Sequence, residues 1–219
     1  MKISPTLTEV KEIAKTGKYD ILPVSCEILS DFITPIEAMR ILQNVSTHCY
    51  LLESAQANEA WGRYTFLGYD PKLEINCIDG HMKLGKLSVE TENPSEYIRQ
   101  ILSEYKSPKF DYLPSFTGGL VGYFSYDYLG YKEKSIRGKA RDTEDFKDVD
   151  LMLFDKVIAF DNLCQKIILI ANMSLDAPET GYNKAIVELK QLRELLMHGE
   201  KKQNMGGKLL GEVTPLFDK

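Results

Sequence analysis

The sequence lacks the short motifs that mark common nucleotide and metal sites. No two of its four cysteines form a CxxC pair, and neither a G-x-G-x-x-G nor a phosphate-loop spacing occurs in its 219 residues. With only three histidines, no His/Cys/Asp cluster has the spacing of metal ligands. No serine, histidine and aspartate arrangement suggests a nucleophile either. We therefore predict no catalytic residue and no metal site on this chain.

Long apolar runs and a basic excess are also missing. No stretch approaches 18 uninterrupted apolar residues, and the N-terminus has no apolar signal core, so we expect no membrane association. The formal net charge of −5 argues against nucleic acid as a partner. We read the chain as cytoplasmic, which agrees with cysteines that are widely spaced and expected to be buried thiols: Cys26, Cys49, Cys77 and Cys164.

Strand-like and helix-like segments are interspersed, and turn signals join many of the strands. Asp79-Gly80 and Asp161-Asn162 predict hairpins, which favour an antiparallel sheet over a doubly wound parallel one. The fold class is therefore α+β, mainly an antiparallel sheet with helices packed outside. Helices are expected to begin near Ser4-Pro5, Thr34-Pro35, Asn93-Pro94 and Pro178, and strands to include 19–29, 48–53, 63–68, 73–78, 118–127, 151–160 and 166–171.

Composition changes twice along the chain. Residues 131–150 are rich in charge, basic first and acidic second, and form either a solvated excursion or a segment that docks a partner. Residues 199–219 contain Gly-Gly and Lys-Lys pairs and end without a helix-stop signal. We therefore predict one domain over residues 1–198 and a linker over residues 199–219.

The run Gly118–Asp127 combines three glycines with three aromatic residues in a strand-like segment. Glycine inside a strand usually marks a bulge or a close approach to the backbone, and aromatic rings supply rigid walls. The run therefore first suggests a ligand cradle.

A second unusual segment is Leu51–Ser54, where an apolar strand ends in a carboxylate and a hydroxyl. Such a pair at a strand end is usually a solvated corner, but it can also bind an ammonium group. Arg63 follows at the start of the next predicted strand. If the strands pair, Glu53 and Arg63 form either an ordinary cross-strand ion pair or a cleft of opposite charges that suits a free amino acid.

Three segments together resemble the N-terminal region of anthranilate synthase component I. The resemblance rests on their order and spacing and covers the chain from about residue 5 to the tail. The segments are Leu51-Leu52-Glu53-Ser54, Gly62-Arg63-Tyr64-Thr65-Phe66-Leu67-Gly68, and Gly118-Gly119-Leu120-Val121-Gly122-Tyr123-Phe124-Ser125-Tyr126-Asp127.

The resemblance implies an enzyme of tryptophan biosynthesis, a lyase that converts chorismate and ammonia to anthranilate and pyruvate. Magnesium is expected for the full-length enzyme and none on this chain, and a glutamine amidotransferase subunit (component II) is expected to supply the ammonia. L-Tryptophan is expected to inhibit by binding Leu52, Glu53 and Ser54, with Arg63 a less secure member. The resemblance also implies a cleft wall formed by Gly119, Leu120, Gly122 and Tyr123.

The family's chorismate-binding portion is C-terminal, and none of its motifs occurs here. We therefore expect an N-terminal fragment that carries part of the tryptophan site, lacks the catalytic half and is inactive alone. Two alternatives stay open at this point. One is the equivalent domain of aminodeoxychorismate synthase component I, in the folate pathway, and the other is a stand-alone module that senses an amino acid.

Overall fold

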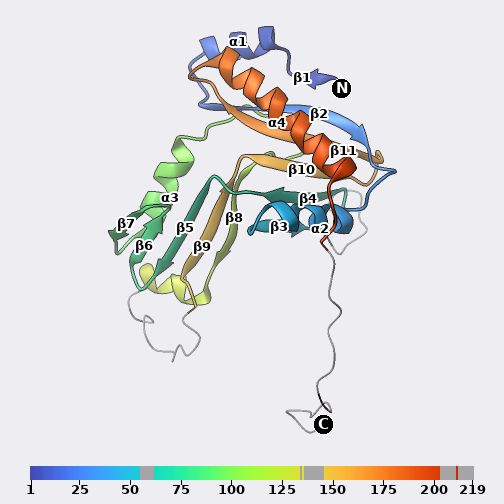
Figure 1. Ribbon diagram of the computed structural model, residues 1–219. Helices are drawn as coiled ribbons and strands as arrows, with labels where there is room; N and C mark the ends of the chain where they lie inside the picture. The colour runs from blue at the N-terminus through green and yellow to red at the C-terminus, as the bar shows by residue number, and fades with distance from the viewer. Residues whose placement is uncertain (55–61, 134, 136–145, 203–210, 212–219) are drawn as a thin grey trace.

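The computed structural model describes residues 1–54, 62–133, 135, 146–202 and 211. These residues form two antiparallel β-sheets, four α-helices and one 3₁₀ helix (Figure 1). The predicted α+β class is confirmed, with two sheets in place of one. Within the described part of the chain, no helix is both long and apolar enough to cross a membrane.

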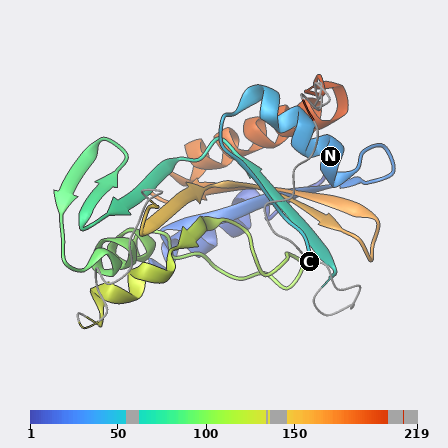
Figure 2. The same cartoon turned by 90° about the horizontal axis from the view of Figure 1, so that it is seen from below.

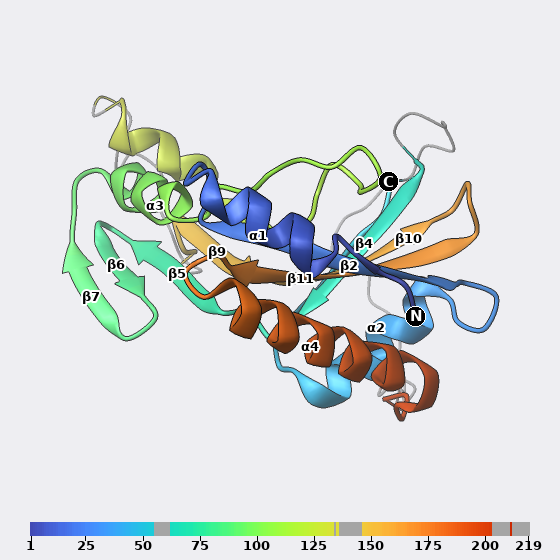
Figure 3. The same cartoon turned by 90° about the horizontal axis from the view of Figure 1, so that it is seen from above.

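The larger sheet has six strands, and three α-helices cover one of its faces. Helices α1 (Leu7–Lys15), α2 (Pro35–Val45) and α4 (Pro178–His198) pack on that face (Figure 3). The segment 104–118 crosses the opposite face (Figure 2), where Phe110, Leu113 and Phe116 cover the strands. The strand order is β1 (Ile3–Ser4), β2 (Ile21–Leu29), β11 (Lys166–Ser174), β10 (Lys156–Asp161), β4 (Tyr64–Tyr69) and β3 (Cys49–Leu52).

The smaller sheet has five strands and its own apolar core. Helix α3 (Pro94–Ser103) and the 3₁₀ helix η1 (Tyr126–Tyr131) contribute side chains to this core, which covers one face. The strand order is β7 (Leu87–Glu90), β6 (His81–Leu84), β5 (Leu73–Ile78), β9 (Val149–Phe154) and β8 (Gly119–Phe124).

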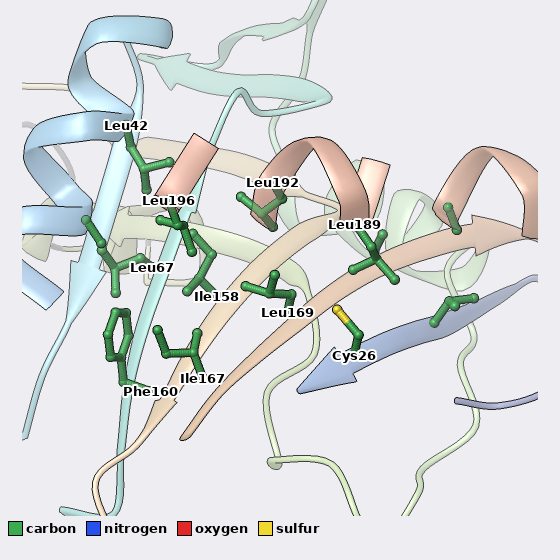
Figure 4. Close-up of a cluster of buried hydrophobic side chains, with 14 of the residues drawn as sticks. Cys26, Leu42, Leu67, Ile158, Phe160, Ile167, Leu169, Leu189, Leu192 and Leu196 are labelled. Atoms are coloured by element: carbon green, nitrogen blue, oxygen red, sulfur yellow. The ribbon is translucent and has the colours of Figure 1, made fainter. Parts of the chain in front are cut away.

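Helix starts were predicted better than helix faces. Thr34 and Glu37 form the expected capping box at the start of α2, in which each side chain accepts the other's backbone N–H. A similar box places the cap of α1 at Thr6, not at Ser4-Pro5. The apolar spacing in α2 predicts a core face of Ile36, Ala38, Met39 and Leu42, and this is partly wrong, because Ile36 is exposed and Ile41 is buried. Figure 4 shows Leu42 in the buried cluster.

The predicted strand 151–160 is wrong as a single strand. It divides at Asp155 into β9 and β10, which belong to different sheets. The predicted hairpin across Asp161-Asn162 is confirmed as β10 and β11. Apolar residues fill both β9 and β10, so hydrophobicity alone gave no sign of the change of sheet.

The cysteine prediction holds for two of the four thiols. None of the four forms a disulfide; Cys26 and Cys77 are buried and Cys49 is half-buried. Cys164 is exposed, which contradicts the expectation. It lies in the turn between β10 and β11, where neither sheet core reaches it. Most of the charged segment 131–150 and the tail beyond residue 202, apart from Gly211, lie outside the described residues.

Close packing of the chain against itself accounts for two glycines of the Gly118–Asp127 run. A Cβ on Gly122 would lie 1.9 Å from the backbone oxygen of Asp150, on the partner strand β9. A Cβ on Gly118 would lie 2.6 Å from Nδ2 of Asn172. Both glycines also have a positive φ, 143° at Gly118 and 152° at Gly122, which other residues rarely adopt.

We predict that Gly122→Ala lowers the free energy of unfolding by at least about 2 kcal/mol, because β8 must move away from β9. The matched control is Gly17→Ala, which also has a positive φ (60°) but no heavy atom within 4 Å of the new Cβ. It should cost about 1 kcal/mol. Urea denaturation of both variants measures the difference, and equal costs would contradict the packing explanation.

Candidate functional site

The segment Leu51–Ser54 lies at the end of β3, an edge strand of the larger sheet. Tyr50 anchors this strand to the smaller sheet. Its buried ring meets the ring of Phe154 on β9 edge-on, with centroids 4.7 Å apart. Gly68 on β4 leaves room for that ring, since a Cβ there would lie 2.2 Å from Tyr50 Cε1. The end of β3 is therefore held in a defined place by aromatic packing.

Side chains beyond Tyr50 become progressively more exposed. Leu51 packs against the helix-covered core, whereas Leu52 is 47% exposed. Glu53 and Ser54, which follow the last residue of the strand, are both exposed. The three residues predicted to bind an amino acid thus extend from an anchored strand into solvent.

Arg63 is held by a carboxylate that the sequence analysis missed. Its Nε donates to Oδ1 of Asp161 at 3.1 Å, and its Nη2 donates to Oδ2 at 2.7 Å. The Asp161 side chain is fully buried, and its Oδ1 also accepts the backbone N–H groups of Leu163 and Cys164. One carboxylate therefore closes the β10–β11 turn and orients the guanidinium.

This pairing lowers the pKa of Asp161. Burial alone would raise the pKa of that carboxyl, but the hydrogen bonds from Arg63 and from the Cys164 N–H outweigh burial and lower it to about 2. The hydrogen bond to Asp161 likewise raises the pKa of Arg63 above its usual value. Both groups are therefore charged at neutral pH.

The predicted pairing of the two strands is confirmed, but the ion pair of Arg63 is not with Glu53. Strands β3 and β4 are antiparallel neighbours, with Leu52 opposite Phe66. The carboxylate next to Arg63 comes from β10, on the other side of β4. In the sequence, Asp161 is recognisable only as part of an Asp-Asn turn. No local pattern connects it to Arg63, which lies 98 positions earlier.

The four residues predicted as a cleft wall do not share one face of β8. Leu120 packs into the core of the smaller sheet, and Tyr123, 39% exposed, meets Phe146 edge-on at 5.9 Å. Gly119 pairs with Phe154, the ring that Tyr50 contacts, so the start of β8 lies near β3. Gly122 lies three residues further along β8, against Leu151.

A small cavity of about 120 Å³ borders the start of the glycine run. Gly118, Gly119, Phe154 and Asn172 are among the residues that line it. The cavity does not include Leu52, Glu53, Ser54 or Arg63. Among the described residues, no group of three or more His, Cys, Asp or Glu side chains could hold a metal ion.

Comparisons with known proteins agree on one family. No protein-family model matches the chain. It is 34% identical over 198 residues to anthranilate synthase component 1 of Acetivibrio thermocellus, and 36% identical over 196 residues to that of Pseudomonas aeruginosa. The alignments cover 88% and 86% of this chain. The chain belongs to the anthranilate synthase component I family.

The match is to the N-terminal region of the family, and it is partial. The chain spans 39% of the length of each of these two relatives. The crystal structure of anthranilate synthase component I from Streptococcus pneumoniae is also similar, at 25% identity and a TM-score of 0.49. That alignment covers 76% of this chain and 36% of the pneumococcal chain.

We predict that Asp161→Asn lowers the free energy of unfolding by about 3 kcal/mol at pH 7, because Arg63 loses its charged partner. The pKa of Asp161 is lower in the folded chain than the unfolded value of about 3.9. Its contribution to stability is therefore complete above about pH 5 and is lost as the pH falls toward 2.

Urea titrations between pH 7 and pH 2 test this prediction. The difference in the free energy of unfolding between wild type and Asp161→Asn should become smaller as the pH falls. The control, Asp31→Asn, changes an exposed carboxylate before α2 and should cost less than about 0.5 kcal/mol. A difference in the free energy of unfolding that stays constant with pH would show that the carboxylate charge does not cause the loss of stability.

Proposed function

We propose that this chain is the N-terminal regulatory and scaffolding part of an anthranilate synthase component I. The observation that carries the proposal is the sequence relationship, which extends over 86–88% of the chain. In this proposal the complete enzyme is a lyase that converts chorismate, with glutamine or ammonia, to anthranilate and pyruvate. A glutamine amidotransferase subunit supplies the ammonia. The chemistry, including magnesium binding, belongs to the part of the relatives' length that this chain does not match, so the chain alone is inactive.

The proposed regulatory role is to carry part of a feedback site for L-tryptophan. The Glu53 carboxylate would pair with the ligand's ammonium group, and the Ser54 hydroxyl would add a hydrogen bond. Leu52, 47% exposed, offers an apolar contact beside them. Their position at the end of a strand anchored by Tyr50 supports the proposal, because a fixed carboxylate loses little freedom on binding.

Arg63 is the proposed contact for the ligand's carboxylate. Asp161 and the Cys164 sulfur occupy its Nε and Nη2, and its Nη1 makes no hydrogen bond to the described residues. The outer edge of the guanidinium thus supports a role in binding a second carboxylate. Gly119, Leu120, Gly122 and Tyr123 remain a proposed wall of the same cleft. Inhibition would then be a coupling free energy between this site and the catalytic site.

We predict that the isolated chain binds L-tryptophan with a dissociation constant of about 1 mM or weaker, since only part of the cleft is present. Isothermal titration calorimetry measures this directly. D-Tryptophan serves as the control for nonspecific association. Micromolar binding of the L-isomer would refute the idea that the cleft needs residues beyond this chain.

We predict that Glu53→Ala and Ser54→Ala, each made in a full-length subunit containing this chain, raise the tryptophan concentration for half-inhibition at least about tenfold. The uninhibited rate should change little, because neither residue would touch chorismate. Steady-state rates of anthranilate formation measure both quantities. Glu12→Ala removes an exposed carboxylate on α1 and is the control. Unchanged inhibition in both variants would remove these residues from the site.

A further inference from the structure

The chain does not leave the domain directly after α4. Residues Gly199–Lys202, which we call the latch, run across the exposed surface of α2. Lys202 and Arg40 exchange two hydrogen bonds of 2.9 Å, from Lys202 N to Arg40 O and from Arg40 Nε to Lys202 O. Asn44 Nδ2 donates to Glu200 O at 2.5 Å, and Lys201 pairs with Glu37. The contacts therefore extend from the first turn of α2 to its last.

A glycine brings the latch this close to α2. A Cβ on Gly199 would lie 2.5 Å from Cγ2 of the buried Ile41, and closer still to the backbone oxygen of Leu195 in the last turn of α4. The φ of Gly199 is −66°, an ordinary value, so the glycine is needed for space and not for backbone conformation. A larger residue would therefore conflict with Ile41 on α2 and with Leu195 at the end of α4.

Helix α2 is joined by a short turn to β3, and the segment Leu52–Ser54 lies at the end of that strand. Only residues 46–48 separate α2 from β3, and the Ser46 side chain organises them. Its Oγ donates to His48 O at 2.8 Å and accepts the N–H of Asp70 at 3.0 Å, which ties the turn to the end of β4. A change at the last turn of α2 is therefore passed through a short, hydrogen-bonded connection to β3.

We propose that the latch reinforces the order of β3: docked on α2 it restrains β3 together with the packing of Tyr50, and undocked it leaves that packing and the pairing with β4 to hold the strand alone. The contacts are suited to a reversible device. The side chains of Lys201 and Glu37 are 47% and 36% exposed, and exposed contacts of this kind are individually weak. This inference does not depend on what that segment binds.

Two variants undock the latch by different means. Gly199→Ala acts through steric conflict with Ile41 and with the backbone oxygen of Leu195, and it removes no hydrogen-bonding group. The double variant Arg40→Ala/Asn44→Ala removes side-chain contacts from α2, and alanine favours helix more than asparagine does, so lost helix propensity cannot explain a looser α2. The control is Gln43→Ala, an exposed position on the same turn as Asn44.

Limited proteolysis and amide exchange report on the two halves of the proposal. Trypsin cleaves after Lys201 and Lys202, so undocking should speed cleavage at these two sites about fivefold. The backbone amides of Cys49–Leu52 should exchange with solvent about fivefold faster in both variants. Gln43→Ala should change neither rate. Exchange in β11, in the centre of the larger sheet, should stay at its wild-type rate and show that the fold is intact.

Two results would overturn the proposal. Faster tryptic cleavage with unchanged exchange in β3 would mean that the latch docks without controlling the strand. Unchanged cleavage in both variants would mean that the latch contacts do not hold the segment in solution. Neither result bears on tryptophan binding, which the Glu53 and Ser54 variants test separately.

Discussion

The arrangement of the two sheets depends on the carboxamide of Asn172. Its Nδ2 donates to the backbone oxygens of Thr117 and Asp155, at 2.6 and 2.9 Å, and its backbone N–H also donates to Asp155. Asp155 is the one residue between β9 of the smaller sheet and β10 of the larger one; the chain also crosses between the sheets at residues 70–72. Thr117 precedes the glycine run. One side chain thus links the corner between the sheets to the start of β8, and part-buried backbone oxygens there find their donors.

The candidate site depends on this corner. Phe154, next to Asp155, receives the ring of Tyr50, and Tyr50 positions the end of β3. On the other side of β4, the buried Asp161 fixes Arg63 and the β10–β11 turn together. The same packing explains two glycines of the Gly118–Asp127 run. Gly118 makes room for Asn172, and Gly122 makes room for β9, so close packing of the chain against itself accounts for both.

The family relationship and the geometry bear on different questions. Similarity to anthranilate synthase component I identifies the chain, which spans 39% of the length of two relatives. The geometry describes how the Leu52–Ser54 segment is supported. Tyr50 on β3 packs against Phe154 of the smaller sheet, and α2, with the latch on its surface, precedes β3 in the chain. An edge strand such as β3 is more easily displaced than a central one, because half of its backbone hydrogen-bonding groups lack a partner strand. Contacts that hold or release it are therefore a physically reasonable means of control.

Local patterns in the sequence determined the helix starts, the β10–β11 hairpin, the α+β class and the family resemblance. Capping boxes and turn residues act within a few positions, so they can be read without a structure. Tertiary structure alone decided the division at Asp155, the Arg63–Asp161 pair, the exposure of Cys164 and the docking of Gly199–Lys202 on α2. Each of these joins residues far apart in the chain or depends on where a core ends. The physical reason is that a contact between residues far apart in the chain produces no pattern in the sequence around either residue.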